Sequence, residues 1–310
     1  MNRLEVERNV QRVLRRQHSL ITTTQAERAG LSRPALRRRA AAGRLDAVPG
    51  ARGLYRDPAQ PITHHQRALA PILIHRRLAA AAYETAGWLY GVDGIRPRAR
   101  VDIAVEANAC HANPLAVVHQ VFGFSKRDVR VVDGVPCVTP ELALLQLAAT
   151  RDFDDTELVF VDMACRKLLT PQSVLKMLDR YAMPGRNGVV VVREVAARWD
   201  GQRLPGSPPE LKLGRILESY GFTIAYQEGV DLGNGEERFP DIRIVGHPIV
   251  VEFQSEKHHS VRKAMRHDST RALRLTAAGL HVLPASQADI DNGGRDVVAA
   301  IRAIISGAAA

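Results

Sequence analysis

The chain has 310 residues, of which 45% are hydrophobic, and its 43 basic and 33 acidic side chains give a net charge of +10. At roughly 100 to 200 residues per domain, this length predicts two or three domains with cores of their own and excludes a disordered basic tail. The cysteines lie 27 and 28 residues apart without a CxxC or Cys/His cluster, which disfavours a zinc site and a disulfide framework. The N-terminus lacks an apolar signal region and no run of about 18 apolar residues occurs, so we expect a soluble cytoplasmic protein.

The positive charge is concentrated at the start of the chain. Residues 1–57 contain thirteen arginines, no lysine and five acidic residues, so eight of the ten net positive charges lie in the first fifth of the sequence. Such a surface attracts polyanions by counterion release, and the guanidinium fork matches phosphate oxygens. The alternative explanation is a solvated helical face.

The same segment has a sequence of helix and strand signals. Residues 3–17 carry apolar side chains at helical spacing with arginines between them, which predicts an amphipathic helix. Thr22, Thr23 and Thr24 are N-cap candidates for a short helix ending near Gly30, and Ser32 caps the next helix, which ends at residues 40–43. Residues 44–48 and 54–56 predict two strands joined by a Pro/Gly turn. Helix, turn, helix and hairpin together outline a winged helix-turn-helix.

In such a motif the second helix enters the major groove and the wing lies beside it. The candidate phosphate and base contacts are therefore Arg33, Arg37, Arg38 and Arg39 on the helix, with Arg52 and Arg56 at the wing. Because consecutive residues on a helix point in different directions, we expect at least one of residues 37–39 to face solvent or an acidic neighbour.

This segment resembles the N-terminal winged-helix domain of AbiEi-type antitoxins of abortive-infection systems. The resemblance rests on Gly30-Leu31-Ser32 before the basic helix, on Gly43-Arg44-Leu45 and on the closing Gly53-Leu54-Tyr55-Arg56. It implies DNA binding, and a winged helix used only for protein–protein contact is the alternative.

Residues 61–200 predict a middle α/β region with less chemistry. We expect a long Ala-rich helix from His64 to Gly87, strands at residues 101–105 and 129–132, and a helix after Thr139-Pro140-Glu141. The histidines at 75, 111 and 119 share no pattern, so we expect surface or hydrogen-bonded side chains. The Gly/Pro-rich residues 200–209 indicate a linker, which predicts domains at residues 1–60, 61–200 and 201–310.

The last hundred residues carry acidic residues at the start of a predicted helix and on predicted strands. Glu210 lies in the first turn of an amphipathic helix that ends at Gly221. Strands are expected around residues 222–226, 240–244 and 249–254, and a tight turn joins the last two. This arrangement places Asp241 on one strand and Glu252 on the next, with Gln254 on the same face as Glu252.

These residues look like the PD-(D/E)XK nuclease motif, and the tail is similar to the very-short-patch-repair-endonuclease-like families. Besides Glu210, Pro240-Asp241 and Glu252-Phe253-Gln254, the resemblance rests on Lys257-His258-His259 and on Asp268 and Arg271 of a D-x-x-R helix. It covers residues 207–290 and implies a restriction-endonuclease-like domain.

The resemblance implies phosphodiester hydrolysis with Mg²⁺ or Mn²⁺ and without zinc or an organic cofactor. Asp241 and Glu252 would hold the metal, which lowers the pKa of a bound water, and Glu210 would complete the shell. Gln254 stands where many relatives have lysine, so Lys257 would have to supply the missing charge. His259 or His258 would act as general base or acid. The alternative that these acids are ordinary surface residues is disfavoured, because Glu252 lies inside the apolar run at residues 249–253.

Together these features predict a multidomain α/β protein with an N-terminal winged helix-turn-helix, a middle α/β region and a C-terminal restriction-endonuclease-like domain. The favoured hypothesis is a DNA-binding, metal-dependent endonuclease. The alternative is a non-enzymatic repressor of antitoxin type with a degenerate nuclease fold, and a third hypothesis is a defence or repair component that acts only in a complex. The expected partners are double-stranded DNA and a toxin or defence-complex protein, without a membrane.

Overall fold

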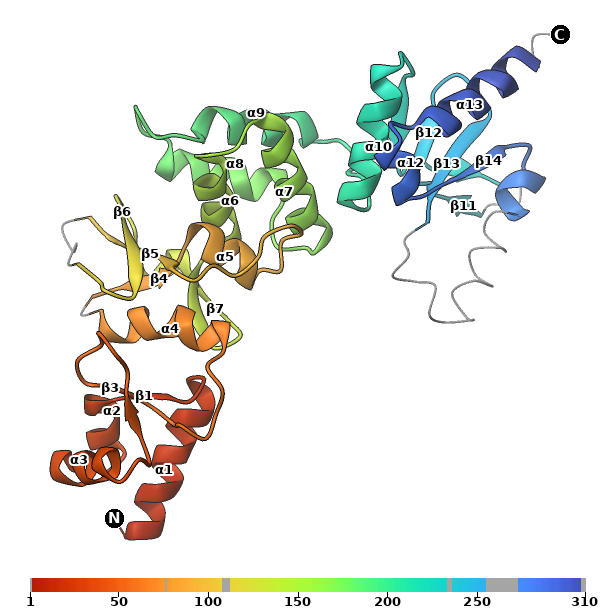
Figure 1. Ribbon diagram of the computed structural model, residues 1–310. Coiled ribbons are helices and arrows are strands. Elements are labelled where there is room, and N and C mark those ends of the chain that lie inside the picture. Colours follow the sequence, from red (N-terminus) through yellow and green to blue (C-terminus); the bar gives the residue numbers. More distant parts are fainter. Residues whose placement is uncertain (1, 76, 108–111, 233–235, 255–272, 308–310) are drawn as a thin grey trace. The chain divides into compact units, whose positions relative to one another are not determined.

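The computed structural model describes residues 2–75, 77–107, 112–232, 236–254 and 273–307 (Figure 1). The chain divides into two compact units, Met1–Thr156 with Leu169–Ala196 and Glu157–Leu168 with Ala197–Ala310. Two of the boundaries fall inside helices, α7 (Phe153–Cys165) and α9 (Val189–Trp199). Helices and sheets occur in both units, so the chain is a multidomain α/β protein. Within the described ranges no helix is both long and apolar enough to cross a membrane.

Three helices open the first unit: α1 (Arg3–Arg16), α2 (Thr23–Arg28) and α3 (Arg33–Ala41). Each begins after a residue whose side chain accepts a hydrogen bond from a backbone N–H of the first turn; these residues are Asn2, Thr22 and Ser32. The predicted caps at Thr22 and Ser32 are therefore confirmed. The apolar sides of the three helices share one core, which includes Val10, Leu14, Ala26 and Leu36.

A small antiparallel sheet completes this N-terminal part. Its strands are β1 (Leu20–Thr22), β2 (Asp46–Ala47) and β3 (Leu54–Arg56), in the order β1-β3-β2. The predicted hairpin is present, because Ala47 pairs with Tyr55. Strand β1, which the sequence did not predict, adds to the other edge of β3, and both Leu20 and Ile21 are buried.

A five-stranded mixed sheet forms the centre of the rest of the first unit, in the order β6-β5-β4-β8-β7. Its strands are β4 (Ala79–Ala81), β5 (Val101–Glu106), β6 (Ala116–Val121), β7 (Val129–Val132) and β8 (Val135–Val138). The pairs β5–β6 and β4–β8 are parallel, whereas β4–β5 and β7–β8 are antiparallel. The helical elements of this part are α4 (His64–Ile74), α5 (Tyr83–Leu89), the 3-10 turn η1 (Lys126–Asp128), α6 (Pro140–Ala148) and α8 (Pro171–Tyr181).

The expectation of one long helix from His64 to Gly87 is wrong. Helix α4 ends at Ile74, and Ala79–Ala81 form the central strand β4 before α5 begins. Alanine has high helix propensity, but these alanines pair with β5 on one side and with β8 on the other. Their small side chains are buried at the middle of the sheet, so tertiary packing overrides the local preference.

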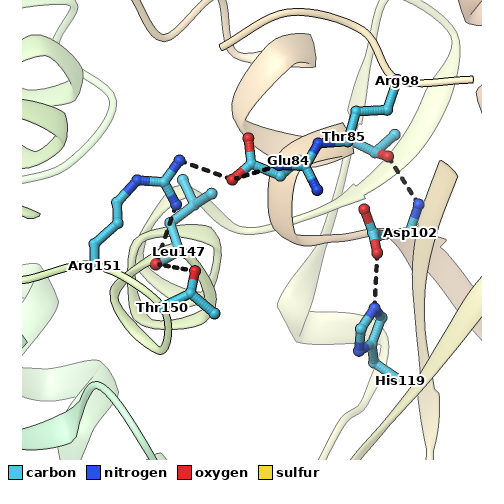
Figure 2. Close-up of polar contacts among 8 residues, drawn as sticks. All are labelled: Glu84, Thr85, Arg98, Asp102, His119, Leu147, Thr150 and Arg151. Carbon is cyan, nitrogen blue, oxygen red and sulfur yellow. Dashed lines mark hydrogen bonds and ion pairs between the residues drawn. The ribbon is translucent and has the colours of Figure 1, made fainter. Parts of the chain in front are cut away.

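Polar side chains tie α5 to the sheet and to α6 (Figure 2). His119 on β6 contacts the Asp102 carboxylate through Nε2 at 2.8 Å, and the Asp102 backbone N–H donates to Thr85 Oγ1 at 2.9 Å. Arg151, which follows α6, donates to Glu84 on α5 at 2.7 Å. The expectation of a hydrogen-bonded side chain is therefore confirmed for His119. This network fixes the first turn of α5 against β5 and the end of α6.

The second unit is built on a four-stranded sheet in the order β14-β13-β12-β9. Strands β9, β12 and β13 are antiparallel neighbours, and β14 runs parallel to β13. The strands are β9 (Ile224–Tyr226), β12 (Ile242–Ile244), β13 (Ile249–Phe253) and β14 (His281–Ala285), and a separate hairpin pairs β10 (Val230–Asp231) with β11 (Glu237–Arg238). The helices are α10 (Pro208–Ser219), α12 (Gln287–Asp291) and α13 (Arg295–Gly307), and residues 273–277 are also helical.

A buried carboxylate links three helices of this unit. Glu157 on α7 has a fully buried side chain that accepts a hydrogen bond from Trp199 Nε1 at 2.8 Å. Arg198 lies 3.1 Å from the same carboxylate, and Arg215 on α10 donates to its other oxygen through Nε at 3.1 Å. A buried charge needs such partners, so Glu157 holds α7, the end of α9 and α10 in one arrangement.

Candidate nucleic-acid interface

Helix α3 presents the main group of predicted contact residues. Leu36 is buried in the shared core, which turns the opposite side of the helix outward. Arg37 and Arg38 are exposed on that side, and neither makes an ion pair with any residue in the described ranges. Two exposed guanidinium groups that form no ion pair with a described residue are suited to contact an anion.

Two other arginines of α3 already have acidic partners. Arg33 donates to Glu27 at the end of α2 at 2.6 Å, although 67% of its side chain is exposed. Arg39 donates to Glu7 on α1 at 2.5 Å, and only 22% of its side chain is exposed. The expectation that residues 37–39 cannot share one direction is confirmed, since Arg39 turns to an acidic neighbour. Arg39 therefore joins α3 to α1.

The hairpin separates its two arginines in the same way. Arg56 has a side chain that is 16% exposed, lies 3.7 Å from Asp46 and donates to the backbone oxygen of Gln60 at 3.1 Å. Arg52 is exposed in the turn between β2 and β3, and no ion pair of it occurs within the described ranges. The exposed guanidinium groups of the predicted set are thus those of Arg37, Arg38 and Arg52, together with the Glu27-bound Arg33.

Another set of exposed arginines lies on α1, outside the predicted contact residues. Arg8, Arg12, Arg15 and Arg16 are all exposed. Their spacing of four, three and one residues along the helix was the sequence signal for a shared face.

The predicted acidic site of the second unit begins with Glu210 in the first turn of α10. Its side chain accepts hydrogen bonds from Ser207 Oγ at 2.8 Å and from the Gly206 backbone N–H at 2.7 Å, so it serves as a cap of its own helix. Gln227 donates through Nε2 to Glu210 and to Asp241 at 3.3 Å each and so bridges the two carboxylates. Burial, and next the nearby charge of Asp241, raise the pKa of Glu210.

Asp241 and Glu252 meet at the neighbouring ends of two strands. Ile242 pairs with Val251, so the next residues outward in the same register are Asp241 and Glu252. The Phe253 backbone N–H donates to Asp241 Oδ2 at 2.8 Å. Asp241 lies one residue before β12 rather than within it, which differs from the prediction, although its backbone oxygen still accepts a hydrogen bond from the Gln227 N–H beside the end of β9. Gln254 is exposed just beyond β13.

These acids do not form a complete metal shell. In the described part of the chain, no group of three or more His, Cys, Asp or Glu side chains is placed to hold a metal ion. Both oxygens of Glu210 already accept hydrogen bonds from its own helix start, which leaves Asp241 and Glu252 as a pair. Lys257, His258, His259, Asp268 and Arg271 lie outside the described residues. Among the described residues, the carboxylates available to a divalent cation are therefore those of Asp241 and Glu252, and Mg²⁺ is usually held in proteins by one or two carboxylates together with water.

The comparison with protein families bears on the N-terminal helices and hairpin. Residues 9–56 match the family described as "Transcriptional regulator, AbiEi antitoxin". The matched segment, called the AbiEi-type domain below for this similarity, contains most of α1, all of α2 and α3, and the three-stranded sheet.

Two other comparisons concern curated proteins and solved structures. No curated protein matches the chain. Among solved structures, the RV2827C protein from Mycobacterium tuberculosis aligns over 74% of this chain and 89% of its own, with 17% sequence identity and a TM-score of 0.38.

Proposed function

We propose that the protein is a DNA-binding transcriptional regulator of the antitoxin type. Its AbiEi-type domain would act as a winged helix-turn-helix, with α2 and α3 as the helix pair and the β2–β3 hairpin as the wing. The observation that carries the proposal is the coincidence of the family match at residues 9–56 with exposed arginines on α3 that have no ion pair within the described ranges.

In this proposal the arginines of the domain have two different roles. Arg37, Arg38 and Arg52 contact the phosphates and base edges of double-stranded DNA, because their guanidinium groups are exposed. Arg39 and Arg56, which are largely covered and bound to Glu7 and Asp46, hold the helices and the hairpin in place. Arg33 contributes less than Arg37 or Arg38, since binding DNA competes with its ion pair to Glu27.

The test is a titration of a fluorescent duplex from the DNA upstream of the protein's own reading frame, repeated over a series of salt concentrations. If Arg37 and Arg38 each neutralise one phosphate, replacing both with alanine lowers the slope of log K against log salt by about 1.8. The matched control is Lys176→Ala with Arg193→Ala, which removes the same charge from two exposed positions on α8 and α9. An unchanged slope in the α3 variant would refute the assignment of Arg37 and Arg38 as phosphate contacts.

Regulation is tested separately from binding. A reporter gene behind the same upstream DNA should be repressed by the wild-type chain and by the control protein. The protein with Arg37→Ala and Arg38→Ala should not repress it. The antitoxin part of the proposal implies a toxin protein as partner. A toxin gene next to this one should therefore arrest cell growth when it is expressed alone, and growth should be restored when both genes are expressed together. Repression without such rescue would leave a regulator that is not an antitoxin.

A second candidate function, hydrolysis of DNA by the second unit, is favoured by the register that sets Asp241 opposite Glu252. Helix α10 and strands β9, β12 and β13 also lie close to the helix and the three strands predicted for the nuclease-like domain. The test is incubation of supercoiled, linear and single-stranded DNA with Mg²⁺ or Mn²⁺, beside Asp241→Ala and Glu252→Ala proteins. Cleavage that both variants abolish would establish the nuclease; no cleavage on any substrate would leave regulation alone.

A further inference from the structure

Helix α1 carries a group of arginines, called here the arginine face of α1, that the proposed contacts of α3 do not use. Its members are Arg8, Arg12, Arg15 and Arg16, which are exposed and form no ion pair with a residue in the described ranges. Together with Glu7 and Gln11 they line an open depression of about 470 Å³. Four arginines and one glutamate give this depression three net positive charges.

The helix itself does not need this charge. Like charges three and four residues apart destabilise a helix, and Arg8, Arg12 and Arg15 have that spacing. The helix dipole favours arginines in the last turn, but Arg8 and Arg12 lie before that turn. An anion bound across the face would offset the repulsion between these side chains.

Glu7 joins the arginine face to α3. Its carboxylate binds Arg39, and because 47% of the Glu7 side chain is exposed, the junction of the two helices is open to solvent. At 100° per residue, Glu7 lies about 20° from the buried Leu14, at the border of the packed side of α1. Arg15 and Arg8 lie about 80° and 100° further around the helix. The arginine face therefore begins beside the edge of α1 that adjoins α3.

The exposed arginines of α3 continue outward from the same junction. On this helix Arg39 lies about 60° from the buried Leu36, and Arg38 lies about 100° further in the same direction. Arg38 thus follows the junction on α3 as Arg8 and Arg15 follow it on α1. The arginines of the two helices form one basic surface, with the Glu7–Arg39 ion pair between them.

The chemistry of this surface favours a phosphate backbone over a protein partner. The cores of protein–protein interfaces are depleted in charge and enriched in aromatic side chains, whereas every side chain that lines the depression is polar or charged. Arginine supplies all of its positive charge, and the guanidinium fork matches phosphate oxygens. From Arg8 to Arg16 the face spans about 12 Å along the helix axis, a length comparable to about three phosphates of one strand.

We propose that the arginine face of α1 and the exposed arginines of α3 bind one DNA duplex together, with α1 holding the sugar-phosphate backbone beside the groove that α3 enters. The inference rests on the proposed DNA binding by α3. It adds the part of the contact that does not depend on base sequence, because phosphate contacts carry no sequence information. The Glu7–Arg39 ion pair sets the spacing between the two groups of contacts.

The experiment titrates the full chain into a single fluorescent duplex over a series of salt concentrations, with either the upstream sequence or a scrambled sequence of the same length. Arg8→Ala with Arg15→Ala should lower the slope of log K against log salt by about 1.8 and weaken binding to both sequences by the same factor, about tenfold or more at 0.1 M salt. Alanine keeps the helix, and circular dichroism with urea unfolding checks that the variant is folded. The Lys176→Ala, Arg193→Ala protein is the charge-matched control and should keep the wild-type slope.

A variant that adds charge gives a result that loss of folding cannot produce. Gln11 lines the depression, and it lies between Glu7 and Arg15 around the helix. Gln11→Arg should therefore raise the salt slope by about 0.9 and tighten binding to both sequences.

The outcomes separate this inference from the proposed function. If Arg37→Ala with Arg38→Ala lowers the slope but both α1 variants leave it unchanged, only the inference is overturned and the arginine face is left to an acidic protein. If the α1 charge removal weakens binding to the upstream sequence alone, α1 reads bases rather than phosphates and the inference also fails. A protein that combines the α1 and α3 changes should lose about 3.6 from the slope, because both helices contact the same duplex. No binding of the wild-type chain to any duplex overturns DNA binding itself.

Discussion

Removing the Glu157 carboxylate tests whether the buried cluster stabilises the second unit. Glu157→Ala removes the carboxylate that accepts a hydrogen bond from the Trp199 indole N–H and forms ion pairs with Arg198 and Arg215. Breaking a buried ion pair by removing one partner costs about 3–5 kcal/mol. The lower end applies here, because the side chains of Arg198 and Arg215 are 42% and 22% exposed and water can hydrate them after the change. We therefore expect a loss of about 3 kcal/mol in the free energy of unfolding.

The assay uses the positions of the two tryptophans. Trp199 lies in the second unit and Trp88 in the first, so in a Trp88→Phe background the indole fluorescence reports unfolding of the second unit alone. With a denaturant slope of about 2 kcal/mol per molar urea, the expected loss lowers the urea midpoint by about 1.5 M.

A conservative replacement serves as the matched control. Glu157→Gln keeps an acceptor for the Trp199 N–H but removes the charge, so its loss should be about half as large. If Glu157→Ala shifts the midpoint no more than an exposed Arg193→Ala change, the cluster does not stabilise the unit and the reasoning from burial is refuted.

Two further predictions concern pH and charge. Burial raises the pKa of Asp128, but the hydrogen bonds from Arg180 and Ser125 outweigh burial, so the net shift of this pKa is downward. The Asp128 carboxylate therefore stabilises the fold at pH values above its unfolded pKa. This stability is lost as the pH falls through the folded pKa. Arg180→Ala should therefore move acid unfolding of the first unit to higher pH, followed by Trp88 fluorescence in a Trp199→Phe protein; an unmoved midpoint would refute it. The pKa of Glu210 is raised by burial and by Asp241, so its contribution is present below the unfolded pKa and falls as the pH rises through the folded pKa. Glu210→Gln should thus gain stability relative to wild type between pH 4 and pH 7 in urea titrations, and a constant difference would contradict the assignment.

Local features of the fold could be predicted because they depend on residues near in sequence. Ser32 caps α3 through a backbone group three residues away, and the turn before Gly53 returns β3 along β2. In the second unit the spacing of Asp241 and Glu252 around a tight turn was enough to predict that they lie beside each other in the register of two neighbouring strands, although Asp241 lies one residue before β12. Hydrogen bonds over a few residues form with little entropic cost of loop closure, so the sequence specifies them directly.

The long-range contacts of the candidate interface were beyond such reasoning. Arg37, Arg38 and Arg39 are consecutive arginines that the local sequence does not distinguish. Only Arg39 forms an ion pair with Glu7, which lies 32 residues earlier. The alanines at 79–81 become a strand because β5 and β8 offer backbone partners on both sides.

The sequence by itself therefore determined the concentration of arginine in the first 57 residues, the helix caps, the hairpin and the acidic pair at the strand ends. Only the tertiary structure decided which arginines are left exposed for an anion, that Glu210 caps its own helix, and that the arginine face of α1 adjoins α3. The physical reason is that an ion pair or a buried side chain depends on which distant elements pack together, and local propensity does not encode that packing.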